Sequence, residues 1–442
     1  MAEAQFVVVG SFGAPMKLFR IEASGVFQYI SDVGSSGPSP TYIVQSRCKR
    51  YVYCTCETED AASSEVLAFF LEEGCHPTPP KLRLLSRLPS EGAAPCHLSI
   101  DDDSTHLIVS NYFSGNVVVF PLSEGALLPP CQTVSFGGPA TVNGVPRPQC
   151  RGGPHSHQTV HHPSSGGVLL CELGQNAVYT YKYDRTEGPR GEQVLSEVGR
   201  WDAPEGFGPR HLVLHPSGNY AYVVFEEANA VAVLSVDAKG RVAALDGCAM
   251  AQSPQSLQSP PPQASQSQGT LLSTLRVGED AGMNAAEVLL SPDARFLYVS
   301  NRDVAPPAPV QKETADVTED TAGTAGTGVG TAGVETAGTG TELASRCSIA
   351  VFEILRDGRL LRRIQLTPSL GRHPRGITLL PGSKGQPARL AVANKDPSLG
   401  SGCNVVVFDI DPVTGCLLAA CVTQSPSVPL ESPSWIHLLH TY

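Results

Sequence analysis

Residues 208–237 read GPRHLVLHPSGNYAYVVFEEANAVAVLSVD. The stretch contains three apolar runs that are rich in β-branched and aromatic residues, and turn residues such as Pro-Ser-Gly separate the first two. Runs of this kind joined by short polar turns are typical of consecutive antiparallel β-strands. The stretch therefore predicts a meander of three strands, opened by Pro209.

The same unit recurs along the chain. Pro40, Pro95, Pro154 and Pro209 open successive copies and stand 55, 59 and 55 residues apart, and further copies begin at Asn284 and Pro374. Each copy continues into a third strand, such as NVVVFPLSEG at 116–125, and into a weaker fourth strand, such as LRLLSRL at 82–88. Four strands in about 50 residues predict the blade of a β-propeller.

The two ends of the chain supply the missing pieces of a seventh copy. Residues 433–439, PSWIHLL, resemble a first strand without successors, whereas Phe6–Gly10, Lys17–Ile21 and Phe27–Val33 resemble three successors without a first strand. Pairing them closes a ring and removes its open edges. We therefore predict an all-β fold, a seven-bladed β-propeller of four-stranded antiparallel blades, forming one domain over residues 1–442. Two β-sandwiches, the alternative, would not explain complementary fragments at the two ends.

Two segments interrupt the repeat. Residues 249–269 carry no charged or aromatic side chain, and residues 304–345 are rich in Thr, Ala and Gly. Neither segment has the apolar area to offset the entropy lost on ordering, so we expect both to be disordered loop inserts.

Composition excludes several classes of protein. With 43 glycines and 37 prolines the chain does not suit a coiled coil or a helical bundle. The net charge of −11 without a basic run argues against nucleic acid or an anionic membrane as partner. The N-terminal residues resemble neither a signal peptide nor a spanning helix. The 13 cysteines are scattered and lack a CxxC pair, which favours free thiols and a cytoplasmic protein.

In a propeller, the start of each first strand and the end of each second strand meet at the central channel. Aligned first-strand positions are Thr41, Cys96, His157, Arg210, Ala286, Arg375 and Ser434. The second-strand ends add Tyr112, Glu226, Arg302 and Lys395. We expect the arginines and Lys395 to form an open cationic funnel around the Glu226 carboxylate, suited to an anion. The alternative is an Arg–Glu network that only plugs the ring.

The segment His155-Ser-His157-Gln-Thr-Val-His161 raises the question of a metal site. Strand alternation puts these three histidines on one side, but neighbours on one side lie about 6.6 Å apart, and no second cluster has ligand spacing. We therefore expect no metal and no cofactor. A single histidine in the channel, His157, suits a general base because imidazole titrates near neutrality.

The motifs GPRHLVLHPSGNYAYVV at 208–224, PHSH at 154–157, NAAEVLLSPDARFLYVSNR at 284–302 and SNYFSGNVVVF at 110–120 resemble the seven-bladed propeller lactonases, which include bacterial-type 6-phosphogluconolactonases and carboxymuconate cyclases. The resemblance covers the chain apart from the two inserts. It implies that His157, Arg210, Glu226 and Arg302 are the catalytic residues. Two departures stand out: Phe225-Glu226-Glu227 replaces the family's Asn-Glu-Leu, which allows the acid to be shifted by one position, and an insert follows Arg302 directly.

Three functions fit these residues. The first is hydrolysis of a sugar lactone, 6-phosphogluconolactone to 6-phosphogluconate, a step of the pentose phosphate pathway. His157 with Glu226 would activate water, Arg210 and Arg302 would hold the oxyanion, and Arg375, Lys395, Tyr112 and His155 would bind the substrate. The second is a lactonising cycloisomerase acting on an unsaturated dicarboxylate. The third is a binding scaffold without catalysis. The expected partner is a small anionic lactone; the sequence indicates no protein partner.

Overall fold

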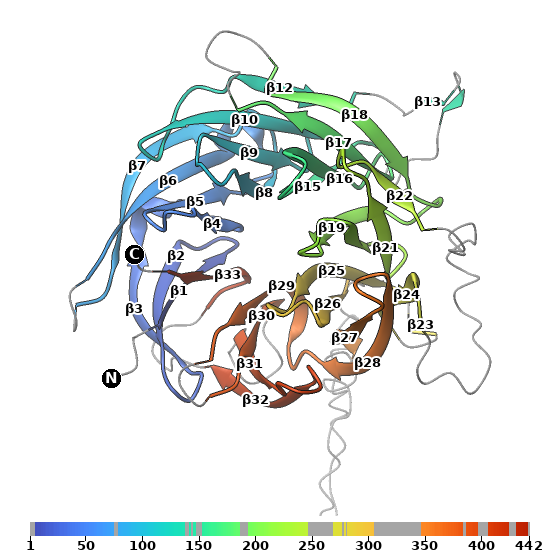
Figure 1. The fold of residues 1–442 in the computed structure, drawn as a ribbon. Coiled ribbons are helices and arrows are strands. Elements are labelled where there is room, and N and C mark those ends of the chain that lie inside the picture. Colours follow the sequence, from blue (N-terminus) through green and yellow to red (C-terminus); the bar gives the residue numbers. More distant parts are fainter. Residues whose placement is uncertain are drawn as a thin grey trace, which may run out of the picture.

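Seven β-sheets are arranged as blades around a central axis (Figure 1). The computed structural model describes residues 5–74, 78–137, 141–142, 145–146, 153–185, 193–245, 268–275, 278–279, 281–304, 346–382, 386–396, 405–423 and 430–440. All seven blades contain four antiparallel strand positions, so the predicted seven-bladed propeller is confirmed.

The strands of each blade follow one another from the axis outward. Blade 1 consists of β33 (Pro433–Leu439), β1 (Gln5–Ser11), β2 (Met16–Ile21) and β3 (Phe27–Val33), and blade 2 of β4 (Ile43–Gln45), β5 (Tyr51–Cys56), β6 (Glu65–Glu72) and β7 (Lys81–Pro89). Blade 3 consists of β8 (Pro95–Ile100), β9 (His106–Asn111), β10 (Asn116–Ser123) and β12 (Gln132–Ser135), and blade 4 of β15 (Ser156–His161), β16 (Gly167–Glu172), β17 (Ala177–Tyr183) and β18 (Leu195–Asp202).

Blades 5–7 complete the ring. Blade 5 consists of β19 (Pro209–Leu214), β20 (Tyr220–Phe225) and β21 (Ala230–Val236), with β22 (Val242–Ala244) and β24 (Leu271–Ser273) side by side on β21. Blade 6 consists of β25 (Met283–Leu290), β26 (Phe296–Asp303), β27 (Ser348–Leu355) and β28 (Leu360–Pro368). Blade 7 consists of β29 (Arg372–Leu380), β30 (Arg389–Asp396), β31 (Val405–Ile410) and β32 (Leu417–Thr423).

Short elements lie beside the blades. They are the strand β11 (Ala126–Leu127) on β10, the hairpin β13 (Thr141–Val142) and β14 (Val145–Pro146), the strand β23 (Gln268–Gly269) on β28, and the 3₁₀ turns η1 (Gly34–Ser36) and η2 (Ala61–Ser63). In the described part of the chain, no helix has the length and apolarity that a membrane span needs.

Blade 1 is built from both ends of the chain. The last strand, β33, pairs antiparallel with β1 in the register Phe6↔Leu439 to Gly10↔Trp435. The expected closure is therefore confirmed, and both faces of the blade are apolar: Val7 and Val9 pack toward blade 7, and Val8 packs toward blade 2.

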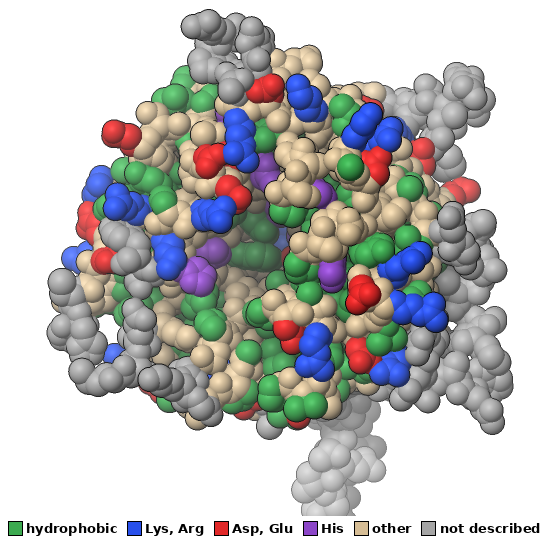
Figure 2. Space-filling model, viewed as in Figure 1, with side chains coloured by type: hydrophobic (Ala, Val, Ile, Leu, Met, Phe, Trp, Pro, Cys, Tyr) green, Lys and Arg blue, Asp and Glu red, His purple; other side chains and the backbone are tan. Residues whose placement is uncertain are grey.

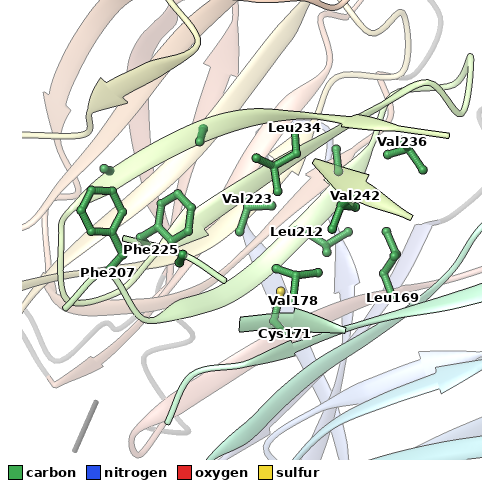
Figure 3. Packing of buried hydrophobic residues seen from close by; sticks show 14 residues of the cluster. Leu169, Cys171, Val178, Phe207, Leu212, Val223, Phe225, Leu234, Val236 and Val242 are labelled. Carbon is green, nitrogen blue, oxygen red and sulfur yellow. The ribbon is translucent and has the colours of Figure 1, made fainter. Parts of the chain in front are cut away.

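The hydrophobic core lies between neighbouring blades. Figure 3 shows one such layer, in which Leu169, Cys171 and Val178 of blade 4 face Leu212 and Val223 of blade 5. Strand alternation gives each blade two apolar faces, and each face buries its side chains against the next blade. Among the described residues, eight cysteines are free thiols, as expected, and five of them are buried.

The two predicted inserts fall almost entirely outside the described residues. The first lies between β22 and β24, two short strands that both pair with β21, so it interrupts the fourth strand position of blade 5. Its last two residues, Gln268 and Gly269, form β23, so the predicted segment is two residues too long. The second lies between β26 and β27.

Candidate active site

A one-residue bulge interrupts the first strand of six blades. In β8, for example, Pro95 pairs with Asn111 and His97 with Ser110, which leaves Cys96 without a partner opposite. The extra residue falls at Cys96, His157, Arg210, Ala286–Glu287, Arg375 and Ser434. These are six of the seven aligned channel positions. Bulges turn a side chain away from the sheet, and here they bring the residues of different blades together at the axis.

Arg210, Glu226 and Arg302 form a buried ion cluster. Arg210 Nε lies 2.9 Å and Arg302 Nη2 lies 2.8 Å from the same oxygen of Glu226, and Asn284 donates to the other oxygen at 3.1 Å. Arg210 also donates to the carbonyl of Ala286 at 2.7 Å. Glu226, and not Glu227, is thus the acid of the cluster. The two guanidinium groups neutralise and hold its carboxylate, so Glu226 is poorly suited to serve as a base.

The open funnel that we expected is wrong for this part of the site. Arg210 is only 2% exposed and Arg302 only 6% exposed. The side chains lie deeper than the ends of their strands suggest because both guanidinium groups bind the carboxylate between them. The cluster is therefore the Arg–Glu network of the alternative interpretation, and it forms the floor of the site.

His157 lies beside this floor and is held by a second buried chain of groups. Its Nδ1 is 3.0 Å from Nε2 of His211, and Nδ1 of His211 is 2.9 Å from Oε1 of Glu287. Burial, with Arg210 as the next cause, holds the pKa of His157 well below its usual value. Burial raises the pKa of Glu287 to about 7. His157 is therefore neutral at physiological pH, as a proton acceptor must be. The expectation that it titrates near neutrality is wrong, and the lowered pKa makes it a weaker base than a free imidazole.

Two aromatic groups rise from His157 toward the surface. Tyr112 meets the His157 ring edge-on at 5.5 Å and stacks on His155 with ring centres 4.4 Å apart. His155 is fixed by a contact of 3.0 Å between its Nδ1 and the Tyr112 carbonyl. The structure thus brings together three residues predicted from the sequence, and Tyr112 and His155 are partly exposed.

Arg375 and Lys395 lie at the partly exposed rim. The Arg375 guanidinium is 5.1 Å and the Lys395 ammonium 4.7 Å from the centre of the Phe12 ring. Arg375 Nη2 is also 3.4 Å from both oxygens of Glu57. Arg302 joins the rim to the floor, because its Nη1 is 3.4 Å from Nε2 of His373. Two partly accessible cations therefore stand above a buried cationic cluster.

A second ring of side chains closes the channel one level below. Its residues each follow an aligned channel position by one, and its contacts cross the axis: His97 of blade 3 meets His211 of blade 5 with ring centres 5.5 Å apart. Tyr42 stacks between His97 and Trp435 at 4.2 and 4.3 Å. One face of the ring is hollowed at its centre (Figure 2), but at this level side chains fill the axis.

The structure gives no support to a metal site. Among the described residues, no three His, Cys, Asp or Glu side chains are grouped so that they could hold a metal ion. His161, the third histidine of the candidate segment, instead packs edge-on against Tyr183 at 5.1 Å.

Sequence analysis missed four residues of the site for two reasons. His211 and Glu287 directly follow channel positions, and simple strand alternation assigns them to the opposite side; only the bulge brings them to the axis. Glu57 and Phe12 directly follow the second strands of blades 2 and 1. The rule that identified Tyr112 and Lys395 would have found both.

Comparisons with known proteins agree with this architecture. The chain is 30% identical over 197 residues to the 6-phosphogluconolactonase of Bacillus subtilis, which is 44% of this chain and 51% of that protein. It is 23% identical over 416 residues to the 6-phosphogluconolactonase of Formosa agariphila, covering 92% of this chain and 93% of that one. The matches to the Bacillus protein and to two uncharacterized Lactococcus lactis proteins span between 51% and 64% of their length.

Solved structures share the fold at low identity. A Lactobacillus plantarum protein superposes with a TM-score of 0.69 at 20% identity, over 99% of this chain and 100% of that one. The periplasmic gluconolactonase of Pseudomonas aeruginosa gives a TM-score of 0.66 at 19% identity, over 99% of both chains. The model of the family described as lactonase, 7-bladed beta-propeller matches residues 7–437. The chain therefore belongs to the seven-bladed propeller lactonase family.

Proposed function

We propose that this protein hydrolyses a sugar lactone, and that its substrate is 6-phosphogluconolactone, opened to 6-phosphogluconate as in the pentose phosphate pathway. The observation that carries the proposal is a neutral, buried imidazole, His157, beside the Arg210–Glu226–Arg302 cluster and below two cations at the rim. The names of the two curated relatives support the choice of lactone.

In the proposed reaction, a water molecule attacks the lactone carbonyl carbon and passes a proton to Nε2 of His157. The carbonyl oxygen becomes an oxyanion, and an arginine fork stabilises the charge that develops there. Arg302 is suited to this role because it is less buried than Arg210 and lies next to the rim. The bond from carbon to the ring oxygen then breaks, and the imidazolium returns its proton to that oxygen. No cofactor takes part.

Arg375 and Lys395 would bind the phosphate. Phosphate prefers a planar guanidinium fork together with a point charge, and these two cations flank the same ring of Phe12. Burial lowers the pKa of Lys395, with Arg375 as the next cause. A bound dianion would reverse that effect. Tyr112 and His155 would form the opposite wall and contact the sugar.

The test is lactone hydrolysis by the purified full chain, at low temperature and slightly acid pH, where the spontaneous reaction is slow. We expect turnover, and we expect Arg375→Ala and Lys395→Ala to raise KM for the phosphorylated lactone but not for gluconolactone. Arg241→Ala, at an exposed ion pair with Asp237 far from the axis, is the matched control. Equal rates of lactone loss with and without the protein would contradict the proposal.

One observation also favours a second candidate. The floor and the rim each carry cations, which would suit the two carboxylates of an unsaturated dicarboxylate in a lactonising cycloisomerase. Turnover of such a dicarboxylate, without turnover of the phosphorylated lactone, would select this reaction. We further propose a cytoplasmic location, because the free cysteines among the described residues suit a reducing compartment.

A further inference from the structure

We propose that Glu287 and His211 are positioning residues that keep the proton of His157 on Nδ1 and leave its Nε2 free to accept a proton. This inference rests on the proposed role of His157 as the base. Neither Glu287 nor His211 was predicted from the sequence. Both are buried, with exposed fractions of 4% and 2%.

The direction of the hydrogen bonds follows from Glu287. Its Oε1 accepts the backbone N–H of Val288 at 3.1 Å and also lies 2.9 Å from Nδ1 of His211. An ionised carboxylate can only accept hydrogen bonds, so above the Glu287 pKa of about 7 the Nδ1 of His211 carries the proton and donates it. A neutral imidazole with a proton on Nδ1 has an unprotonated Nε2. Nε2 of His211 is therefore an acceptor.

The position of the proton on His157 follows in the same way. Its Nδ1 lies 3.0 Å from the acceptor nitrogen of His211, so Nδ1 must be the donor. Nε2 of His157 is left unprotonated. Free imidazole side chains prefer the opposite tautomer, so the buried carboxylate imposes this one through two rings. A buried carboxylate behind a catalytic histidine fixes tautomer and orientation in the same way in Ser-His-Asp triads.

The chain of groups also stabilises the charge that catalysis creates. When Nε2 of His157 takes a proton from water, the ring becomes a cation surrounded by cations: Arg210 from β19, Arg302 from β26 and Arg375 from β29 all act to lower its pKa. Neutral groups also face it, namely Cys96 from β8 at 3.9 Å and Tyr112 after β9. A carboxylate two hydrogen bonds away offsets part of this repulsion.

The experiment combines a spectroscopic and a kinetic measurement on the full chain. With ¹⁵N-labelled histidine, two-bond ¹H–¹⁵N correlation spectra report which ring nitrogen carries the proton, and His157→Gln assigns the His157 signals. We expect the Nδ1–H tautomer in the wild type at pH 7.5. Finding the Nε2–H tautomer there would overturn the proposal, whatever reaction the protein catalyses.

Two substitutions separate positioning from packing. Glu287→Gln keeps an acceptor oxygen but removes the charge, so we expect the same tautomer, kcat lowered about 10- to 100-fold with KM within about twofold, and the acid limb of the kcat/KM profile shifted. Glu287→Met removes the acceptor and should release the tautomer. An unchanged kcat and pH profile in Glu287→Gln would overturn the proposed electrostatic role.

Glu172→Gln is the matched control. Glu172 in β16 is also fully buried, and burial raises its pKa to about 7, but it accepts from the backbone N–H of Gln175 instead of an imidazole. We expect this variant to leave the His157 tautomer and kcat unchanged. If lactone turnover is absent in the wild type while the Nδ1–H tautomer is present, the proposed function fails and the positioning of His157 stands.

Discussion

At the scale of single residues, two cations of the site, Arg210 and Lys395, differ in how deeply they are buried. Arg210 is among the largest fully buried side chains, and its charge is compensated by Glu226 and by the Ala286 carbonyl. Lys395 is partly exposed and contacts the ring of Phe12. Both are cations that the sequence placed in one funnel, yet removing them has different consequences.

We expect Arg210→Ala to lower the free energy of unfolding by about 3–5 kcal/mol, because it leaves the buried Glu226 with one guanidinium partner fewer. In an open funnel, by contrast, the same substitution would leave the fold intact. Lys395→Ala should change the free energy of unfolding by less than about 1 kcal/mol. Urea unfolding followed by fluorescence measures both. Equal free energies of unfolding in the two variants would contradict the expectation that we draw from the difference in burial.

At the scale of the strand, the bulges explain both the success and the limits of the sequence interpretation. The alignment of blades identified His157, Arg210 and Arg375 because a similar turn ends the first strand that each of them begins. Alternation with a period of two could not identify His211, because the bulge makes two consecutive residues reach the axis at two levels. Nothing in one sequence reports burial depth either, so the sequence offered the closed Arg–Glu network around Glu226 only as the alternative to an open funnel.

A glycine of β29 makes room for the closing strand. A Cβ atom at Gly376 would lie 2.5 Å from the carbonyl oxygen of Ser434 and 2.8 Å from Cε3 of Trp435. We expect Gly376→Ala to cost about 1–3 kcal/mol, because the backbone of β33 would have to shift. Gly34→Ala, where a Cβ meets nothing within 4 Å, is the control. If the melting temperature of Gly376→Ala equals or exceeds that of the wild type, blades 7 and 1 can move apart without a loss of stability, and the prediction is wrong.

The first insert offers a prediction at the same scale. Replacing residues 249–267 by a short Gly-Ser linker should leave the melting temperature within about 5 °C of the wild type, because β22 and β24 each keep their pairing with β21 and a change of loop length costs only ~0.6 kcal/mol per doubling. Lactone hydrolysis should also be unchanged. A larger drop in melting temperature would mean that the segment contributes packing.

At the scale of the whole molecule, the ring depends on its last strand. Removing residues 433–442 deletes β33, including the buried side chains of Ile436, Leu438 and Leu439, and exposes the inner edge of β1. Each buried apolar side chain contributes about 1.5–3 kcal/mol, and an open edge favours aggregation. We expect insoluble or protease-sensitive protein in expression and limited-proteolysis tests. A soluble truncation that melts cooperatively would contradict the role of β33.

Buried histidines make the stability of the molecule depend on pH. Burial lowers the pKa values of nine described histidines, and the lowering is large in six of them: His97, His157, His161, His211, His373 and His437. Below about pH 6.5 the unfolded chain binds protons that the folded chain does not, so each group removes up to ~1.4 kcal/mol of stability per pH unit as the pH falls.

Two buried carboxyl groups have the opposite effect on stability as the pH falls. Burial raises the pKa values of Glu172 and Glu287 to about 7, so between about pH 7 and 4.5 the folded state binds their protons more readily than the unfolded state does. Because six histidines oppose two glutamates, we expect the melting temperature to fall from pH 6.5 to pH 5. Calorimetric scans across this range test the sign, and a melting temperature that rises toward pH 5 would refute it.

The pairing of β1 with β33 also has a consequence for synthesis. The ribosome makes β1 among the first residues and β33 among the last of 442, and at about 5–20 residues per second the interval lasts on the order of 20–90 s. Throughout that time the nascent chain holds six blades and a fragment whose inner edge has no neighbour. Blade-by-blade folding can proceed during translation, but the final cooperative step must wait until β33 has been made, so the unpaired edge of β1 is a natural site for a chaperone to occupy in the meantime.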